Sequence, residues 1–207
     1  MDRRVLIAGL FVLLIAAGCD TTVPPNGSPA ASASASPSGA AASQSLLPIP
    51  SLGEEFHGAP DLEARLPSTF DGQPLVVLSL RDSTFFENAA AELEQFRSVV
   101  QAVGGEGEEV SIAVANAAVA ASPFNLAALR VEGADAPALS AAFETAALTA
   151  QQGGASSRAS LGGKEIVKVT APGNLVGSSY FYALDDTLFV VQARDDALAG
   201  RLLESLP

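Results

Sequence analysis

Most of the chain alternates short apolar runs with stretches of helical periodicity. Residues 75–80 form an apolar run of strand length, bounded by Gly72 and by Arg81. Such a run is typical of a buried strand. Residues 110–119 and 126–131 have the same character, so we expect strands there as well.

Helical spacing of apolar residues predicts two helices between residues 61 and 105. We expect residues 61–66 to form a short helix, which Pro67 ends. The second helix begins at about Glu87 and ends at Gly104-Gly105. Its buried face carries four apolar residues: Leu93, Phe96, Val100 and Val103.

Two further helices are marked by an aspartate at the N-cap position, where a carboxylate accepts hydrogen bonds from the free N–H groups of the first turn. Asp135 precedes a helix that Gly153-Gly154 ends, and Asp195 precedes a helix over residues 197–206. The expected buried stripes are Leu139, Phe143, Ala146 and Ala150 in the first helix, and Leu198, Leu202 and Leu206 in the second.

Two hairpins are expected near the C-terminus. Residues 158–161 and 165–170 flank Gly162-Gly163, a pair suited to the positive φ angles of a type I′ turn. Residues 180–184 and 188–193 flank a weaker turn signal, Asp185-Asp186-Thr187.

The strand at residues 180–184 includes three consecutive aromatic residues, Tyr180, Phe181 and Tyr182. Because side chains alternate between the faces of a strand, the tyrosines and Phe181 lie on opposite faces. The outward set either forms an exposed aromatic contact surface or is covered by a helix. We favour cover by a helix.

This order of elements predicts an α+β fold, with an antiparallel-rich sheet and helices packed on one face. Residues 54–207 are expected to form a single globular domain of this class. Residues 62–67 echo residues 202–207, since both segments begin with leucine and end in Leu-Pro. This echo suggests two related half-domains, although six residues of ordinary composition are weak evidence for a duplication.

The first 18 residues have the pattern of an export signal. Arg3 and Arg4 precede an uncharged apolar run over residues 5–17. As a helix this run rises only about 20 Å, whereas the hydrocarbon core of a membrane is about 30 Å thick. We therefore interpret residues 1–18 as a signal peptide.

The end of this run, Ile15-Ala16-Ala17-Gly18-Cys19, resembles the lipobox of bacterial lipoproteins. That family usually has leucine where this chain has Ala16. The resemblance implies cleavage between Gly18 and Cys19 and a lipid anchor on Cys19, made of more than one acyl chain. It also implies that the protein lies on the extracytoplasmic side of the cell membrane, with the membrane as a partner.

Residues 19–53 link this anchor to the globular domain. Residues 21–53 contain no charged side chain and consist mainly of Ala, Ser, Pro and Gly. Such a segment buries too little apolar surface to offset the entropy of ordering it, so it predicts a flexible tether with a span of roughly 30 Å. Residues 46–50 either end the tether or dock on the domain, and we favour the first.

Composition excludes several classes of protein. The chain has 207 residues and a net charge of −12, and it therefore lacks the basic surface that a nucleic-acid-binding protein requires. One cysteine and one histidine exclude an intrachain disulfide and a zinc-finger-like site. Alanine supplies 39 of the hydrophobic residues, but enough Leu, Val and Phe remain to form a core.

Apparent catalytic and cofactor motifs fail on their spacing. Gly163-Lys164 suggests a phosphate-binding loop, but that motif needs glycine in place of Arg158 and serine or threonine in place of Glu165. Residues 105–109 lack the third glycine of a dinucleotide fingerprint. The only imidazole belongs to His57, which we expect to be an exposed residue at the junction of tether and domain. We therefore predict no catalytic residue and no cofactor.

Three acidic clusters remain as candidate cation ligands. Asp185-Asp186 and Asp195-Asp196 would lie close together if the second hairpin folded back towards the last helix, and residues 106–109 supply the third cluster. None has the spacing of an EF-hand loop. We favour a turn, a helix cap and a solvated loop, and therefore predict no metal site.

Three classes of function remain. The favoured one is a non-catalytic, membrane-anchored lipoprotein whose domain contacts a cell-envelope protein or supports an assembly. The alternative is a ligand-binding lipoprotein that takes a small molecule or a cation. An enzyme that uses carboxylates is the third and the least favoured. A closed apolar cavity would indicate the second class, and carboxylates with raised pKa values the third.

Overall fold

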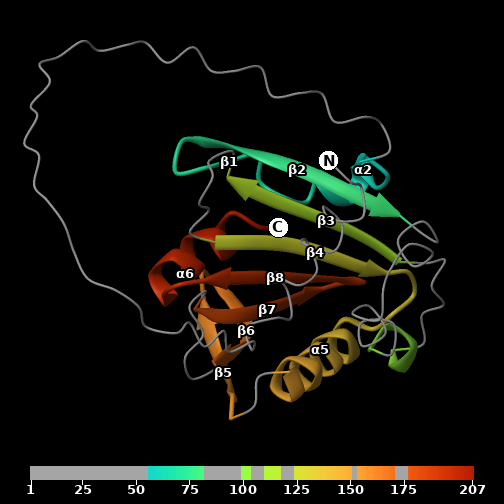
Figure 1. Cartoon of the computed structure of the whole chain (residues 1–207), viewed down its shortest axis with the longest axis vertical. Helices are drawn as coiled ribbons and strands as arrows, with labels where there is room; N and C mark the ends of the chain where they lie inside the picture. Colours follow the sequence, from blue (N-terminus) through green and yellow to red (C-terminus); the bar gives the residue numbers. More distant parts are fainter. Residues whose placement is uncertain (1–55, 82–98, 104–109, 118–123, 151–152, 171–176) are drawn as a thin grey trace, which may run out of the picture.

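Eight antiparallel strands form one sheet in a computed structural model that describes residues 56–81, 99–103, 110–117, 124–150, 153–170 and 177–207 (Figure 1). The strands are β1 (Thr69–Phe70), β2 (Gln73–Arg81), β3 (Val110–Ala117), β4 (Phe124–Val131), β5 (Ala155–Leu161), β6 (Lys164–Thr170), β7 (Ser178–Leu184) and β8 (Thr187–Ala193). Their order across the sheet is β1-β2-β3-β4-β8-β7-β6-β5. The helices are α2 (Pro60–Glu63), α5 (Ala136–Ala150) and α6 (Asp196–Glu204), and a helical turn lies within residues 99–103.

The predicted α+β fold with an antiparallel-rich sheet is confirmed, and the long helix α5 covers one face of that sheet. Leu139 of α5 is buried with Val167 of β6 and Phe181 of β7. The shorter helices α2 and α6 pack on the opposite face, where Leu62 and Leu202 belong to one buried cluster. The two sides of the sheet therefore carry different helices, a division that the sequence analysis did not foresee.

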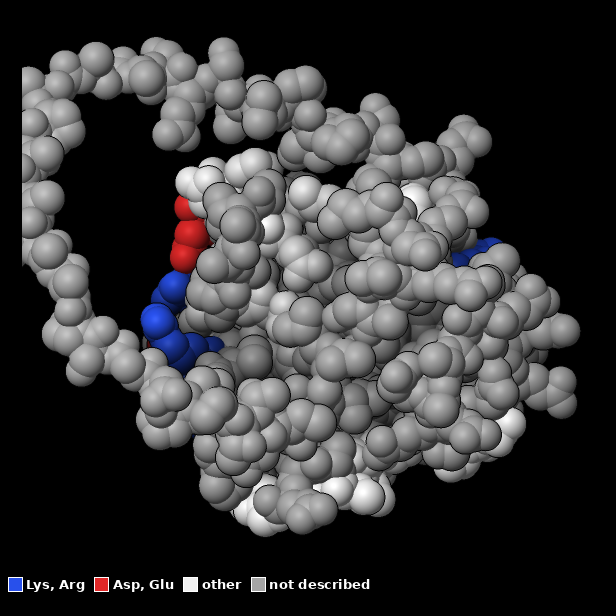
Figure 2. All heavy atoms as spheres, in the orientation of Figure 1, with Lys and Arg blue, Asp and Glu red and all other residues white. Residues whose placement is uncertain are grey.

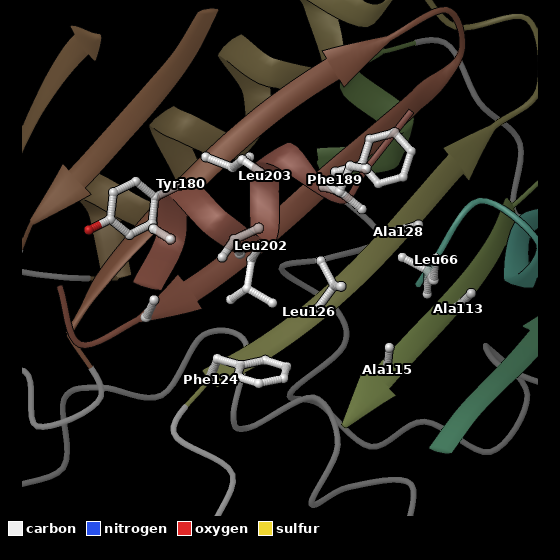
Figure 3. Close-up of a cluster of buried hydrophobic side chains, with 14 of the residues drawn as sticks. Leu66, Ala113, Ala115, Phe124, Leu126, Ala128, Tyr180, Phe189, Leu202 and Leu203 are labelled. Carbon is white, nitrogen blue, oxygen red and sulfur yellow. The ribbon is translucent and has the colours of Figure 1, made fainter. Parts of the chain in front are cut away.

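The central strands are buried on both faces, which explains why they are continuous apolar runs. Every residue of β8 is buried. In β4, Leu126 and Ala128 face α6, while Ala127 and Leu129 face α5. Figure 3 shows the layer on the α6 side of the sheet, in which β4 lies beneath the leucines of α6. Strands covered on both sides do not need the apolar–polar alternation of a half-exposed strand.

The aromatic residues of β7 are covered by helices on both sides. Tyr180 is 1 % exposed and Phe181 is 5 % exposed. Tyr180 and Tyr182 lie on the α6 side, and Tyr182 stacks on Phe189 with 5.7 Å between ring centroids. The alternative of an outward-facing aromatic surface is therefore wrong, and helical cover of the sheet is confirmed.

The predicted caps and the glycine turn are confirmed. Asp135 Oδ2 accepts from the N–H of Ala138 at 3.2 Å, and Asp195 Oδ1 accepts from the N–H of Leu198 at 2.8 Å. Gly162 and Gly163 have φ angles of 60° and 74°, as a type I′ turn requires.

Several predicted elements differ in length from the observed ones. The first helix ends at Glu63, before its expected end at residue 66. Of the helix expected from Glu87, only residues 99–103 are described. The acidic cluster at residues 106–109 lies outside the described residues.

The strand order, but not the placement of the helices, repeats between the two halves. Strands β1–β4 and β5–β8 are each consecutive antiparallel arrays, and β4 joins β8 at the centre of the sheet. The echoed leucines Leu66 and Leu206 are buried in the same cluster. The helices do not follow this repeat, because α5 precedes the second array, whereas the four-residue α2 precedes the first.

Candidate functional site

Polar side chains gather where α2 lies against one end of the sheet. Three residues of successive strands, Arg81, Ser111 and Arg130, stand directly opposite one another, and Thr187 of β8 continues the row. The group that we call the α2 cluster contains His57, Asp61, Glu63, Arg65, Ser79, Arg81, Arg130, Asp185, Asp186 and Thr187.

Asp61 ties α2 to two strands through arginine side chains. Its carboxylate accepts a hydrogen bond from Arg130 Nη1 and another, at 3.2 Å, from Arg81 Nη2. The hydrogen bond from Arg130 holds the pKa of Asp61 below its ordinary value of 3.8. The carboxylate thus stays ionised, as a bridge between β2 and β4.

Glu63 lies between His57 and the buried Ser79. Ser79 Oγ donates to Glu63 Oε1 at 2.6 Å and accepts from the N–H of Ala59 at 2.7 Å. His57 Nδ1 lies 3.0 Å from the same carboxylate oxygen. His57 also forms a parallel β-bridge with Ser79. Together these contacts fasten the segment before α2 to the outer side of β2.

This arrangement differs from that of a serine hydrolase. In a Ser-His-Asp triad the imidazole takes the proton of the hydroxyl, and the carboxylate orients the imidazole. Here the hydroxyl and the imidazole both contact the carboxylate, and Ser79 is only 1 % exposed. The side chain of His57 is 45 % exposed, as expected, but the sequence did not reveal its pairing with Glu63.

The acidic turn between β7 and β8 contacts Arg65. Arg65 Nη1 donates to Thr187 Oγ1 at 2.8 Å, and Thr187 Oγ1 donates to Asp186 at 3.1 Å. A second nitrogen of Arg65 lies 3.8 Å from Asp185. The turn therefore supports the chain that follows α2.

The two Asp-Asp pairs lie at opposite ends of β8, so the fold does not bring them together. Asp185-Asp186 precedes β8 and Asp195-Asp196 follows it. A seven-residue strand places its ends about 20 Å apart. Within the described residues, no group of three His, Cys, Asp or Glu side chains could hold a metal ion.

A second polar group fixes the start of α6. Tyr180 Oη and Lys168 Nζ each donate to Asp196 Oδ1 at 2.6 Å. The hydrogen bonds from Lys168 and then from Tyr180 lower the pKa of Asp196 below 3.8. Burial, and then the hydrogen bond to Asp196, raises the pKa of Tyr180 above its ordinary value of 10.0. Sequence patterns missed this group because its members come from three separate elements.

Ion pairs also occur at the surface. Arg201 of α6 lies 3.2 Å from Asp71, in the turn between β1 and β2. Figure 2 shows basic and acidic side chains next to one another on the left side of the domain. The pair between Arg201 and Asp71 joins α6 to the turn between β1 and β2, but exposed pairs contribute little to stability.

Comparison with known proteins gives no match to a family model, to a curated protein or to a solved structure. Cys19, the predicted lipidation site, lies outside the described residues. Over the described part of the chain, no helix is long and apolar enough to span a membrane.

The α2 cluster and the Asp196 group hold helices and chain segments against the sheet, which is a structural role.

Proposed function

We propose that the protein is a membrane-anchored extracytoplasmic lipoprotein whose domain works by contact with another cell-envelope protein. The observation that carries the proposal is the position of the only cysteine. Cys19 directly follows an uncharged apolar run and a stretch of small residues, as in a lipobox. An anchor of more than one acyl chain would keep such a protein stably at the membrane.

The carboxylates of Asp61, Glu63 and Asp196 are bound by other side chains of the same domain, which supports a contact role. Glu63 is engaged by Ser79 and His57, and Asp61 by two arginines. Carboxylates of a catalytic acid or base tend to have raised pKa values, whereas those of Asp61 and Asp196 are lowered. These carboxylates are well suited to holding the fold together.

Replacement of Cys19 with serine tests the anchor. We expect Cys19→Ser to move the protein from the membrane fraction to the soluble fraction and to abolish acylation at residue 19, as seen by mass spectrometry. The control, Thr22→Ser, leaves the cysteine and the small residues before it intact and should remain in the membrane. If Cys19→Ser stays in the membrane in equal amount after a high-salt wash, lipidation is not the anchor.

A further inference from the structure

Strand β5 forms one edge of the sheet and is exposed along most of its length. Its seven residues pair one-to-one with β6, without a bulge, and no described segment pairs with its other side. Ala155, Ser156, Ser157, Arg158 and Ser160 are all exposed. Such an edge offers backbone N–H and C=O groups to another extended chain.

The turn that follows β5 determines which backbone groups point outward. Leu161 and Lys164 enclose the two-residue turn and are therefore a hydrogen-bonded pair. Hydrogen-bonded and non-hydrogen-bonded pairs alternate along an antiparallel ladder. The backbone groups of Ser156, Arg158 and Ser160 consequently point away from β6.

Arg158, at the midpoint of this edge, is a cation without a partner. It has no ion pair, hydrogen bond or aromatic contact within the described structure. The other described cations all have a partner: Arg65, Arg81, Arg130, Lys164, Lys168, Arg194 and Arg201. In a chain with a net charge of −12, this lone cation is complementary to a carboxylate supplied from outside.

We propose that β5 is the contact site of the domain, and that it pairs with an extended segment of a partner protein bearing a carboxylate opposite Arg158. Main-chain hydrogen bonds would give such a complex its affinity, and the charge pair its selectivity. The partner residues opposite Ala159 and Leu161 would lie on the α6 side, where these two side chains are half-buried. Apolar residues therefore suit those two positions.

A second copy of this chain fits the edge less well. Antiparallel pairing of two β5 strands about their midpoint places Arg158 against its own copy, and like charges directly opposite each other are destabilising. The net charge of −12 on each chain adds to the repulsion. An acidic extended segment avoids the first of these penalties.

Two designed peptides test this site, and each is added to the full protein purified from cells. The probe is an end-capped seven-residue peptide of alternating valine and threonine with glutamate at its centre, and the matched peptide has lysine there. Fluorescence anisotropy at low salt should show the glutamate probe binding about tenfold tighter, because one peptide gains a charge pair and the other a repulsion. Hydrogen exchange should slow in residues 155–161.

Two variants separate charge from backbone pairing. Arg158→Glu should reverse the preference between the peptides. Ser156→Pro should abolish binding of both with little change in melting temperature, since proline is tolerated at an edge-strand N–H that points to solvent. Arg158→Ala should bind the two peptides equally.

Three outcomes would overturn the proposal. These are no binding by the parent protein, equal affinity of the parent for both peptides, or protection from exchange elsewhere than residues 155–161. Self-association of the parent that Ser156→Pro abolishes would assign the edge to a second copy instead. The proposal rests on the contact role given above, but its failure would leave the Cys19 anchor untouched, because fractionation of Cys19→Ser tests that separately.

Discussion

Individual polar residues hold distant parts of this chain together. Ser79 is a clear case, because its one hydroxyl group serves both the N–H of Ala59 and the carboxylate of Glu63. A buried donor or acceptor that loses its partner keeps the cost of its desolvation. The sequence predicted the strand around Ser79 but not this role, since serine within an apolar run has no signal that names its partners.

Replacing Ser79 with alanine should destabilise the domain by about 1–3 kcal/mol, because the N–H of Ala59 and the carboxylate of Glu63 both lose a partner. Urea unfolding measures the change. Ser160→Ala on β5 is the matched control, and as an exposed position it should change stability by no more than about 0.5 kcal/mol. Equal effects of the two substitutions would show that the buried hydroxyl has no special role.

Acid should destabilise the domain through Asp196. Its pKa in the folded protein is lowered, so its contribution is present above the unfolded value and is lost as the pH falls through the folded value. Urea unfolding from about pH 5 to about pH 2 should show a shallower loss of stability for Asp196→Asn than for the parent. Lys168→Gln, which keeps the carboxylate and removes its first donor, should lie between them. An unchanged slope for Asp196→Asn would contradict this assignment.

At the scale of elements, local sequence signals were reliable where the chemistry is local. The caps at Asp135 and Asp195 and the turn at Gly162-Gly163 depend on neighbouring residues only, and all were predicted. Helix α2 is shorter than expected, because the chain beyond Glu63 continues as turns in which the N–H groups of Arg65 and Leu66 donate to carbonyl oxygens three residues earlier. Leu66 is buried although it lies beyond the helix.

The two turn glycines differ in their surroundings and form a natural pair for mutation. A Cβ on Gly162 would lie 2.5 Å from the backbone oxygen of Gly200 in α6, whereas a Cβ on Gly163 would meet nothing within 4 Å. Alanine at either position has a cost of about 1–2 kcal/mol for the left-handed backbone. Gly162→Ala should cost about 1–3 kcal/mol more, because α6 must move.

Thermal or urea unfolding of the two alanine variants checks this difference, with Gly163→Ala as the control for backbone strain. Similar stabilities would mean that α6 is not held against the turn as closely as the geometry indicates.

At the scale of the whole molecule, the fold class was predictable, but the cover of both sheet faces by helices was not. Periodicity identifies a buried run such as residues 75–80, yet it does not say which layer covers each side. The pairing of β4 with β8 joins segments more than fifty residues apart. Nothing local encodes such a contact, and the α2 cluster depends on it, because Thr187 and Arg130 meet across that pair.

The globular domain should fold without residues 1–53. A fragment starting at residue 54 keeps Ala59, Leu62 and Leu66, which are buried on the α6 side, and should melt like the mature protein. A fragment starting at residue 68 removes all three and should lose several kcal/mol, since each buried leucine is worth about 2–5 kcal/mol. Differential scanning calorimetry compares the two fragments. Failure of the longer fragment to fold would place residues 46–50 in the core.

The parallel bridge between His57 and Ser79 also determines on which side of the sheet the described chain begins. It places the first described residues beside β2, and six strand spacings separate β2 from β5. At about 4.8 Å for each spacing, the width of the sheet between them is about 29 Å. The proposed contact strand β5 therefore lies on the opposite side of the sheet from the residues at which the described chain begins.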